Sequence, residues 1–343
     1  MSRRAIFLDC AIGEDRALVT LDGRPERLLL ERGVDQTAQR LGQGSVARVR
    51  RIERGLGTAF LELLDGPDAA APMGELVEGR FVEIVVTAEA RHGKGPVARV
   101  AANADGPLRL TIAGQAVLER IQQFAPDTEL IIGQDARRAI DAAQDAVLEV
   151  VHPLPGGGQI SIEPTRALTA VDVDLGAKGG SDQRRAARQV NLTAIAQGAR
   201  LLRLKGLGGL VVFDLVGKGH DGVAISAAAK AAFAPDGAGV SIGPISRFGL
   251  FELSLPRTVR PLAEVVVDET GMVTPLTAAL ALLRRVEDEA AAHPGARLDI
   301  RAAPDVAEAV APYMVEVHHR FGPRVRLEVD PARVRTAFEV IAE

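Results

Sequence analysis

Three aspartates lie at the ends of two apolar segments near the middle of the chain. Asp172 and Asp174 close the segment TAVDVD, and Asp214 closes the segment GGLVVFD. Successive side chains of a strand point to opposite faces, so Asp172 and Asp174 are expected to share one face. A carboxylate at the end of an apolar strand is normally hydrogen-bonded, ion-paired or bound to a cation. Because Mg²⁺ prefers oxygen ligands, the three residues together predict a magnesium site.

The residues between these segments predict a helix that would bring the aspartates together. From Arg184 to Leu204, apolar residues recur at three- and four-residue steps, and Gly206 is suited to end the helix in a left-handed conformation. A strand–helix–strand unit links parallel strands, whose carboxyl ends meet at one sheet edge where ligands commonly bind. The alternative for any single aspartate is a turn cap or an ion pair with an arginine.

Composition and charge restrict the class of protein. With 343 residues, 47% of them apolar, the chain is long enough for two or three domains with their own cores. A net charge of −4 argues against a nucleic-acid binder that relies on overall charge. No apolar run reaches the length of a membrane span, so we expect a cytoplasmic protein without membrane contact. Cys10 is the only cysteine, which excludes an internal disulfide and a cysteine-based zinc site.

Short strands are expected in the first hundred residues. Residues 3–32 read as strands with a turn at Leu21-Asp22-Gly23-Arg24. Between about residues 42 and 102, alternating apolar segments separated by glycine-rich turns predict a small barrel compatible with an OB fold. The basic loop at residues 91–95 connects two strands of this barrel, and such loops commonly contact nucleic acid. The alternative is a solvated surface, which is the usual role of a run of charges.

The remaining segments alternate between helix and strand. Residues 117–124 and 136–146 predict helices, and residues 129–132 predict a strand. The Pro- and Gly-rich stretch HPLPGGGQ at residues 152–159 is interpreted as a hinge before the aspartate-bearing domain. Residues 275–343 alternate helix and strand patterns and predict a small α+β domain at the end of the chain.

A resemblance to the ribonuclease E/G family is carried mainly by two runs, RALTAVDVDLGAKGGSDQRRAARQVNLTAIAQGARLLRLKGLGGLVVFDLVG and ISRFGLFELSLPR. They resemble the catalytic core of that family. The flanks EDRALVTLDGRPERLLLER and SVARVRRIERGLGTAFLEL are similar to its opening strands and to the start of its RNA-binding barrel. The last segment resembles its small C-terminal domain.

The resemblance implies a multidomain protein of mixed α/β and α+β class. A ribonuclease H-like subdomain would comprise residues 1–37 and 104–152, with an OB-fold RNA-binding barrel inserted at residues 38–103. A deoxyribonuclease I-like catalytic subdomain would occupy residues 153–260. A small α+β C-terminal domain would occupy residues 261–343.

The resemblance also implies roles for individual residues. Asp172 and Asp214 would be the catalytic residues and would bind Mg²⁺, with Mn²⁺ as an alternative. Asp174, at a position that usually carries asparagine, would be a further metal ligand. Phe60 and Lys94 would contact RNA in the barrel, and Arg247 would contact RNA near the catalytic site. Taken from the residues alone, Phe60 is equally compatible with a barrel-core aromatic and Lys94 with a solvated loop charge.

Two elements of the family have no counterpart in the sequence. Asn103–Ile112 is too short to hold a 5′-end sensor subdomain, and the stretch VVVDETGMVTP has no cysteine for a zinc link. A homodimer would therefore need another surface. The resemblance predicts an Mg²⁺-dependent endoribonuclease that cuts single-stranded RNA, as in RNA processing or decay, independently of a 5′-monophosphate. The alternatives are a non-catalytic RNA-binding protein on the same scaffold, for example one acting on ribosomal RNA precursors, and an interaction subunit.

Overall fold

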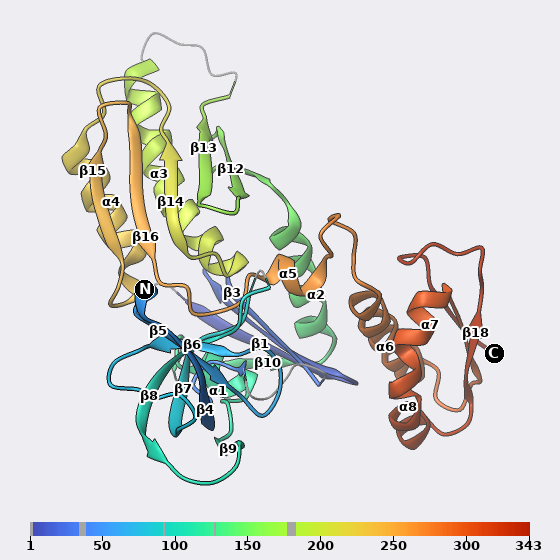
Figure 1. The fold of residues 1–343 in the computed structure, drawn as a ribbon. Helices are drawn as coiled ribbons and strands as arrows, with labels where there is room; N and C mark the ends of the chain where they lie inside the picture. The colour runs from blue at the N-terminus through green and yellow to red at the C-terminus, as the bar shows by residue number, and fades with distance from the viewer. Residues whose placement is uncertain (1–2, 34–38, 92, 127, 177–182) are drawn as a thin grey trace.

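Four sheets organise the described part of the chain into successive units (Figure 1). The computed structural model describes residues 3–33, 39–91, 93–126, 128–176 and 183–343. His92 of the expected basic loop and the expected boundary at residues 37 and 38 lie outside these ranges. The observed organisation, several sheets of mixed α/β and α+β type, agrees with the predicted class.

The N-terminal unit is a four-stranded sheet with a helix on each face. Its strands are β1 (Arg4–Ala11), β2 (Glu14–Leu21), β3 (Arg24–Arg32) and β10 (Leu130–Ile132), in the order β10-β1-β2-β3. Helix α1 (Val117–Gln122) packs with Val19, and α2 (Gln134–Leu148) packs with Leu18. Because Leu18 and Val19 are consecutive residues of β2, they point to opposite faces of the sheet. The predicted turn is present, with positive φ at Asp22 and Gly23, as a two-residue hairpin requires.

The second unit is a ring of strands. Its strands are β4 (Gly44–Glu53), β5 (Thr58–Glu62), β6 (Ala69–Pro72), β7 (Phe81–Ala88), β8 (Val97–Ala104) and β9 (Arg109–Ile112). Pairing of β5 with β4 closes the order β5-β6-β8-β7-β4 into a ring, and β9 pairs with β4 as an additional strand. Alternate residues such as Val49, Leu61 and Ile84 fill the interior. The small barrel is thus confirmed, while its assignment as an OB fold stays a prediction.

The third unit is a six-stranded sheet that carries the aspartates, here called the aspartate sheet. Its strands are β11 (Val151–Pro153), β12 (Gln159–Pro164), β13 (Thr169–Asp174), β14 (Gly209–Asp214), β15 (Ser241–Ile245) and β16 (Leu250–Leu255), in the order β11-β12-β13-β14-β16-β15. The stretch interpreted as a hinge is instead a hairpin. It joins β11 to β12, because Leu154 and the glycines after it form a hydrogen-bonded turn.

Helix α3 (Gln183–Lys205) connects β13 to β14 and packs between two sheets. It and α4 (Gly222–Phe233) cover one face of the aspartate sheet (Figure 1). The other side of α3 contacts β3 of the N-terminal unit. At Gly198 the helix lies so close to β14 that an added Cβ would be 2.8 Å from the Phe213 ring. The predicted helix and its left-handed end at Gly206 are confirmed.

The last unit is a three-stranded sheet packed against helices, as the sequence predicted. After the short helix α5 (Leu262–Val266) its elements are α6 (Pro275–Ala292), β17 (Leu298–Ala302), α7 (Pro304–Val310), α8 (Met314–Phe321), β18 (Val325–Val329) and β19 (Glu339–Ala342). The strand order is β18-β17-β19, and α6 supplies more of the buried apolar residues than any other element of the unit. In the described ranges, no helix is long and apolar enough to cross a membrane.

A buried network of ion pairs joins the N-terminal sheet to α6. Arg16, fully buried, pairs with Asp9, and Arg137 bridges Asp9 to Glu287 of α6 at 2.9 and 2.6 Å. Arg284 of α6 reaches back to Glu14 at 2.6 Å. Burial raises the pKa of Asp9, but hydrogen bonds from the two arginines outweigh it and hold the pKa below its usual value. The network fixes the position of the last unit on the first.

Replacing Arg16 with methionine is expected to destabilise the protein by about 3–5 kcal/mol, because it breaks a fully buried ion pair and removes one of the two guanidinium groups that bind the buried Asp9 carboxylate. Arg3→Met is the matched control. The Arg3–Glu129 pair is exposed, so its loss should cost less than about 1 kcal/mol. Urea unfolding at neutral pH measures both. Equal effects of the two substitutions would contradict a structural role for the network.

Candidate active site

Asp172 and Asp214 are direct neighbours across two parallel strands. The register of β13 and β14 pairs Thr169 with Val211 at one end and Asp172 with Asp214 at the other. Neighbouring strands lie about 4.8 Å apart, and paired residues point to the same face. The strand–helix–strand prediction was therefore correct in placing the two carboxylates together at the carboxyl edge of the sheet.

The two aspartates lie on the open face of the sheet. On β13, Val171 and Val173 are buried against α3, whereas Asp172 and Asp174 are exposed. Asp214 is likewise exposed. The two strands are thus buried on one face only, because the described helices cover a single face of the sheet. Within the described residues, neither Asp172 nor Asp214 has a hydrogen bond or an ion pair, so both carboxylates are available to a ligand.

Asp174 shares the face of Asp172, as predicted, but lies two residues further along β13, roughly 7 Å away by strand geometry. Its carboxylate accepts hydrogen bonds from Gln159 Nε2 at 3.3 Å and from the Gly176 amide at 2.9 Å. Asp174 is therefore held at the turn that follows the strand. Its role as a metal ligand stays a prediction.

A buried asparagine holds the segment that follows Asp214. Asn191 of α3 donates to the Val216 carbonyl at 2.9 Å and accepts from the Val216 amide at 3.0 Å. Only 2% of Asn191 is exposed. Sequence reasoning missed this residue. The available signal was a polar side chain at a helical spacing that otherwise carries the apolar residues Ala187 and Ile195.

Basic residues surround the carboxyl edge. Arg184 lies beside Gly219 in the segment after β14, and Arg188 pairs with Asp221 at 3.1 Å. Asp221 also caps α4. A hydrogen bond from the Ala224 amide and the Arg188 guanidinium hold the pKa of Asp221 below its usual value. Positive charge at this edge would favour the approach of a polyanion.

The turn between β15 and β16 places Arg247 at the same edge. This turn directly precedes Leu250, and Leu250 is the register partner of Asp214 on the neighbouring strand. Arg247 is exposed and lies over the Phe248 ring, with its Cζ 4.7 Å from the ring centroid. The structure therefore brings Arg247 to the edge that carries the two aspartates.

Phe60 and Lys94 lie on the ring of strands, away from the aspartates. Phe60 is half-buried on the outside of β5, because its neighbours Ala59 and Leu61 fill the interior, and Arg51 lies over its ring at 4.6 Å. Lys94 is exposed in the turn between β7 and β8. That connection docks through Glu89 on Thr258, beyond the end of β16 and opposite the carboxyl edge. Phe60 is therefore not a barrel-core residue.

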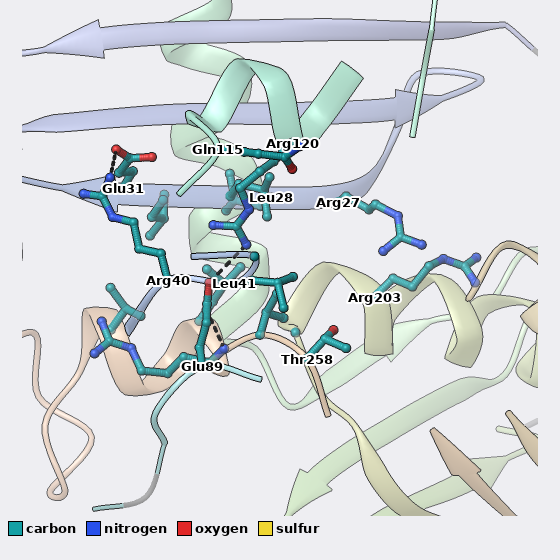
Figure 2. Close-up of a pocket in the computed structure, with 18 of the residues that line it drawn as sticks. Arg27, Leu28, Glu31, Arg40, Leu41, Glu89, Gln115, Arg120, Arg203 and Thr258 are labelled. Atoms are coloured by element: carbon teal, nitrogen blue, oxygen red, sulfur yellow. Dashed lines mark hydrogen bonds and ion pairs between the residues drawn. The ribbon is translucent and has the colours of Figure 1, made fainter. Parts of the chain in front are cut away.

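A cavity of about 560 Å³ is a separate feature at the junction of three units. Figure 2 shows arginines from β3, α1 and α3 around it, with ion pairs from Arg40 to Glu31 and from Arg120 to Glu89. Arg203, near the end of α3, also lines it. By helix geometry this end is about 30 Å from the end of α3 beside the aspartates. The cavity therefore belongs to the packing between units and not to the aspartate pair.

The donor set at the carboxyl edge suits a divalent cation with oxygen preference. Mg²⁺ is commonly bound by one or two carboxylates and completes its shell with water and substrate phosphate. Asp172 and Asp214 supply such a pair. Among the described residues, no group of three or more His, Cys, Asp or Glu side chains is placed to hold a metal. A cation here would thus depend on the pair and on ligands from solvent and substrate.

Comparison with known proteins identifies the segment that carries this site. The sequence model described as the ribonuclease E/G family matches residues 113–258, which include both aspartates, α3 and the turn with Arg247. This segment of the chain is similar to the ribonuclease E/G family. The match agrees with the resemblance seen in the sequence.

Individual members of the family are similar over different lengths. Ribonuclease E of Escherichia coli strain K12 is 37% identical over 201 residues, covering 54% of this chain and 19% of the relative. Ribonuclease G of the same strain is 25% identical over 248 residues, covering 66% of this chain and 51% of the relative. A chloroplastic ribonuclease E/G-like protein of Arabidopsis thaliana is 33% identical over 136 residues, covering 38% of this chain and 13% of the relative. The chain thus spans less than a fifth of ribonuclease E.

Proposed function

We propose that this protein is an endoribonuclease that hydrolyses internal phosphodiester bonds of single-stranded RNA, with Asp172 and Asp214 as its catalytic residues. The observation that carries the proposal is the pair of free carboxylates, in register on adjacent parallel strands, within the segment that matches the ribonuclease E/G family. The proposal includes a requirement for Mg²⁺ bound by this pair.

The chemistry requires a water nucleophile and neutralisation of the phosphate charge. A divalent cation at the pair would polarise the phosphoryl oxygen and lower the pKa of a bound water. Asp172 and Asp214 are held at a fixed spacing by the strand register, and Asn191 fixes the segment after Asp214. The open face of the sheet leaves room for an RNA strand, and arginines at the edge, Arg247 among them, would contact its phosphates.

The ring of strands would bind RNA outside the reaction centre. The Phe60 ring, covered on one side by Arg51, offers a surface on which a base can stack. Lys94 and the exposed arginines of β4 would neutralise phosphates. In this proposal the ring of strands binds the RNA, and the carboxyl edge of the aspartate sheet carries out the cleavage.

A second candidate is a non-catalytic RNA-binding protein on the same scaffold. One observation favours it: in the described residues, no third carboxylate joins Asp172 and Asp214 to form a metal-binding group. Such a protein would bind RNA through the barrel and leave it intact.

Cleavage of an internally labelled single-stranded RNA separates the two candidates. Wild-type protein should cut the RNA with Mg²⁺ and not with EDTA. Asp172→Asn and Asp214→Asn should each slow cleavage by about 100-fold or more, because metal stabilisation of the phosphoryl transition state is worth several kcal/mol. Asp174→Asn is the matched control on the same strand and should retain most of the activity, because asparagine keeps an oxygen ligand at that position. Cleavage that persists in both of the first two variants contradicts the proposal, and salt-sensitive binding without cleavage supports the second candidate.

We further propose that cleavage does not depend on a 5′-monophosphate. In support, β8 ends at Ala104 and β9 begins at Arg109, so the strands of the ring leave only a short connection there. The same RNA with a 5′-triphosphate, a 5′-monophosphate or a 5′-hydroxyl should be cut at similar rates. A strong preference for the monophosphate would overturn this part of the proposal.

A further inference from the structure

Phe248 is the most exposed phenylalanine among the large apolar residues that reach solvent. Of its surface, 76% is accessible, compared with 37% for Phe124. Exposing an aromatic ring of this size forgoes the free energy that its burial would contribute. A single exposed ring is common on protein surfaces, so the evidence for a ligand here comes from how the ring is held and where it lies.

The turn that carries Phe248 is held by hydrogen bonds. The Ser246 hydroxyl accepts from the amides of Phe248 and Leu250, both at 3.3 Å, and the Ser246 amide donates to the Leu250 carbonyl at 2.8 Å. Gly249 closes the turn with φ of 89°. The ring is thus presented on a defined backbone, which reduces the ordering cost of binding to it.

The position of the turn connects the ring to the reaction centre. Leu250, two residues after Phe248, is paired with Asp214, and Asp214 is paired with Asp172. Adjacent strands are about 4.8 Å apart, so the turn lies only one strand away from Asp214. A phosphate at the aspartate pair would therefore have one of its flanking bases near the turn.

The chemistry of Arg247 and Phe248 favours a nucleobase as the ligand over a protein side chain. Arg247 covers one face of the ring and adds positive charge for a phosphate, which an apolar protein partner would not need. Arg51 and Phe60 repeat the same arrangement on the ring of strands, where binding of RNA is proposed. A protein interface also requires a far larger apolar surface than one ring provides.

We propose that Phe248, with Arg247 on its other face, forms a nucleobase-stacking subsite beside Asp214. The subsite holds a base next to the phosphodiester bond that is cut, and so contributes to the choice of cleavage position. This inference rests on the proposed function for its catalytic consequence. The stacking itself is independent of cleavage.

The first test measures stacking without cleavage. A short single-stranded RNA carries the fluorescent base 2-aminopurine at one position at a time and is bound to the Asp172→Asn protein. Stacking on Phe60 should alter the 2-aminopurine fluorescence at one position of the RNA, and stacking on Phe248 should alter it at another. Adding Phe248→Leu should abolish one of these two changes, and adding Phe60→Leu should abolish the other. Phe124→Leu, which alters an Arg-covered ring in the distant cavity, should affect neither.

The second test uses wild-type catalysis. Removing the base that flanks the cleaved bond, with an abasic nucleotide, should slow wild-type cleavage by about tenfold, within the range expected for loss of one stacked base. Phe248→Leu should cleave the intact RNA about tenfold more slowly and should show no further loss on the abasic RNA. Phe124→Leu should respond to the abasic nucleotide as the wild type does.

The outcomes separate the subsite from the proposed activity. If no position of 2-aminopurine responds to Phe248→Leu, the subsite is refuted whether or not the protein cleaves RNA. If the fluorescence change depends on Phe248 and wild-type protein cuts nothing, the subsite stands and the proposed activity fails. An equal abasic effect in wild type and Phe248→Leu would refute the role in choosing the cleavage position.

Discussion

Packing of α3 between two sheets is the constraint on which the candidate active site depends. The helix begins after β13 and ends before β14, so its apolar contacts with both strands hold them parallel and in register. The close approach at Gly198 fixes the distance between α3 and β14, and the hydrogen bonds of Asn191 hold the segment after β14 against the helix. Because β3 covers the far side of α3, the N-terminal unit also supports this register. The ion network through Arg16 and Arg137 extends that support to the last unit.

The same arrangement creates an electrostatic cost that indicates function. Asp172 and Asp214 are like charges on adjacent strands, and such pairs are destabilising. A protein under selection for stability alone would place an arginine or an apolar residue at one of the two positions. Arginines lie instead at the rim, where they would bind phosphates without neutralising the pair. An acidic centre with a basic rim suits a polyanion that approaches together with a cation.

Local periodicity explains which features were predictable from the sequence. The 3.6-residue period of α3 and the two-residue alternation of β13 depend only on neighbouring residues, so the helix and the strands were predictable. The strand–helix–strand order then predicted that the aspartates meet at one sheet edge, whereas the register that pairs Asp172 with Asp214 came from the structure. The exposure of one face of the aspartate sheet was not predictable, because it depends on how distant helices pack and not on the residues of the strands themselves. Asn191 was missed because its partner Val216 is 25 residues away. The hinge interpretation failed because proline and glycine serve tight hairpins as well as linkers.

The proposed function requires that Asp172 and Asp214 together bind one divalent cation. Electron paramagnetic resonance of free Mn²⁺, titrated with the protein in the absence of RNA, counts bound cations directly. Wild-type protein should bind one Mn²⁺ that Mg²⁺ displaces, and the Asp172→Asn/Asp214→Asn double variant should lose that site while Asp174→Asn keeps it. Retention of the site in the double variant would contradict the claim.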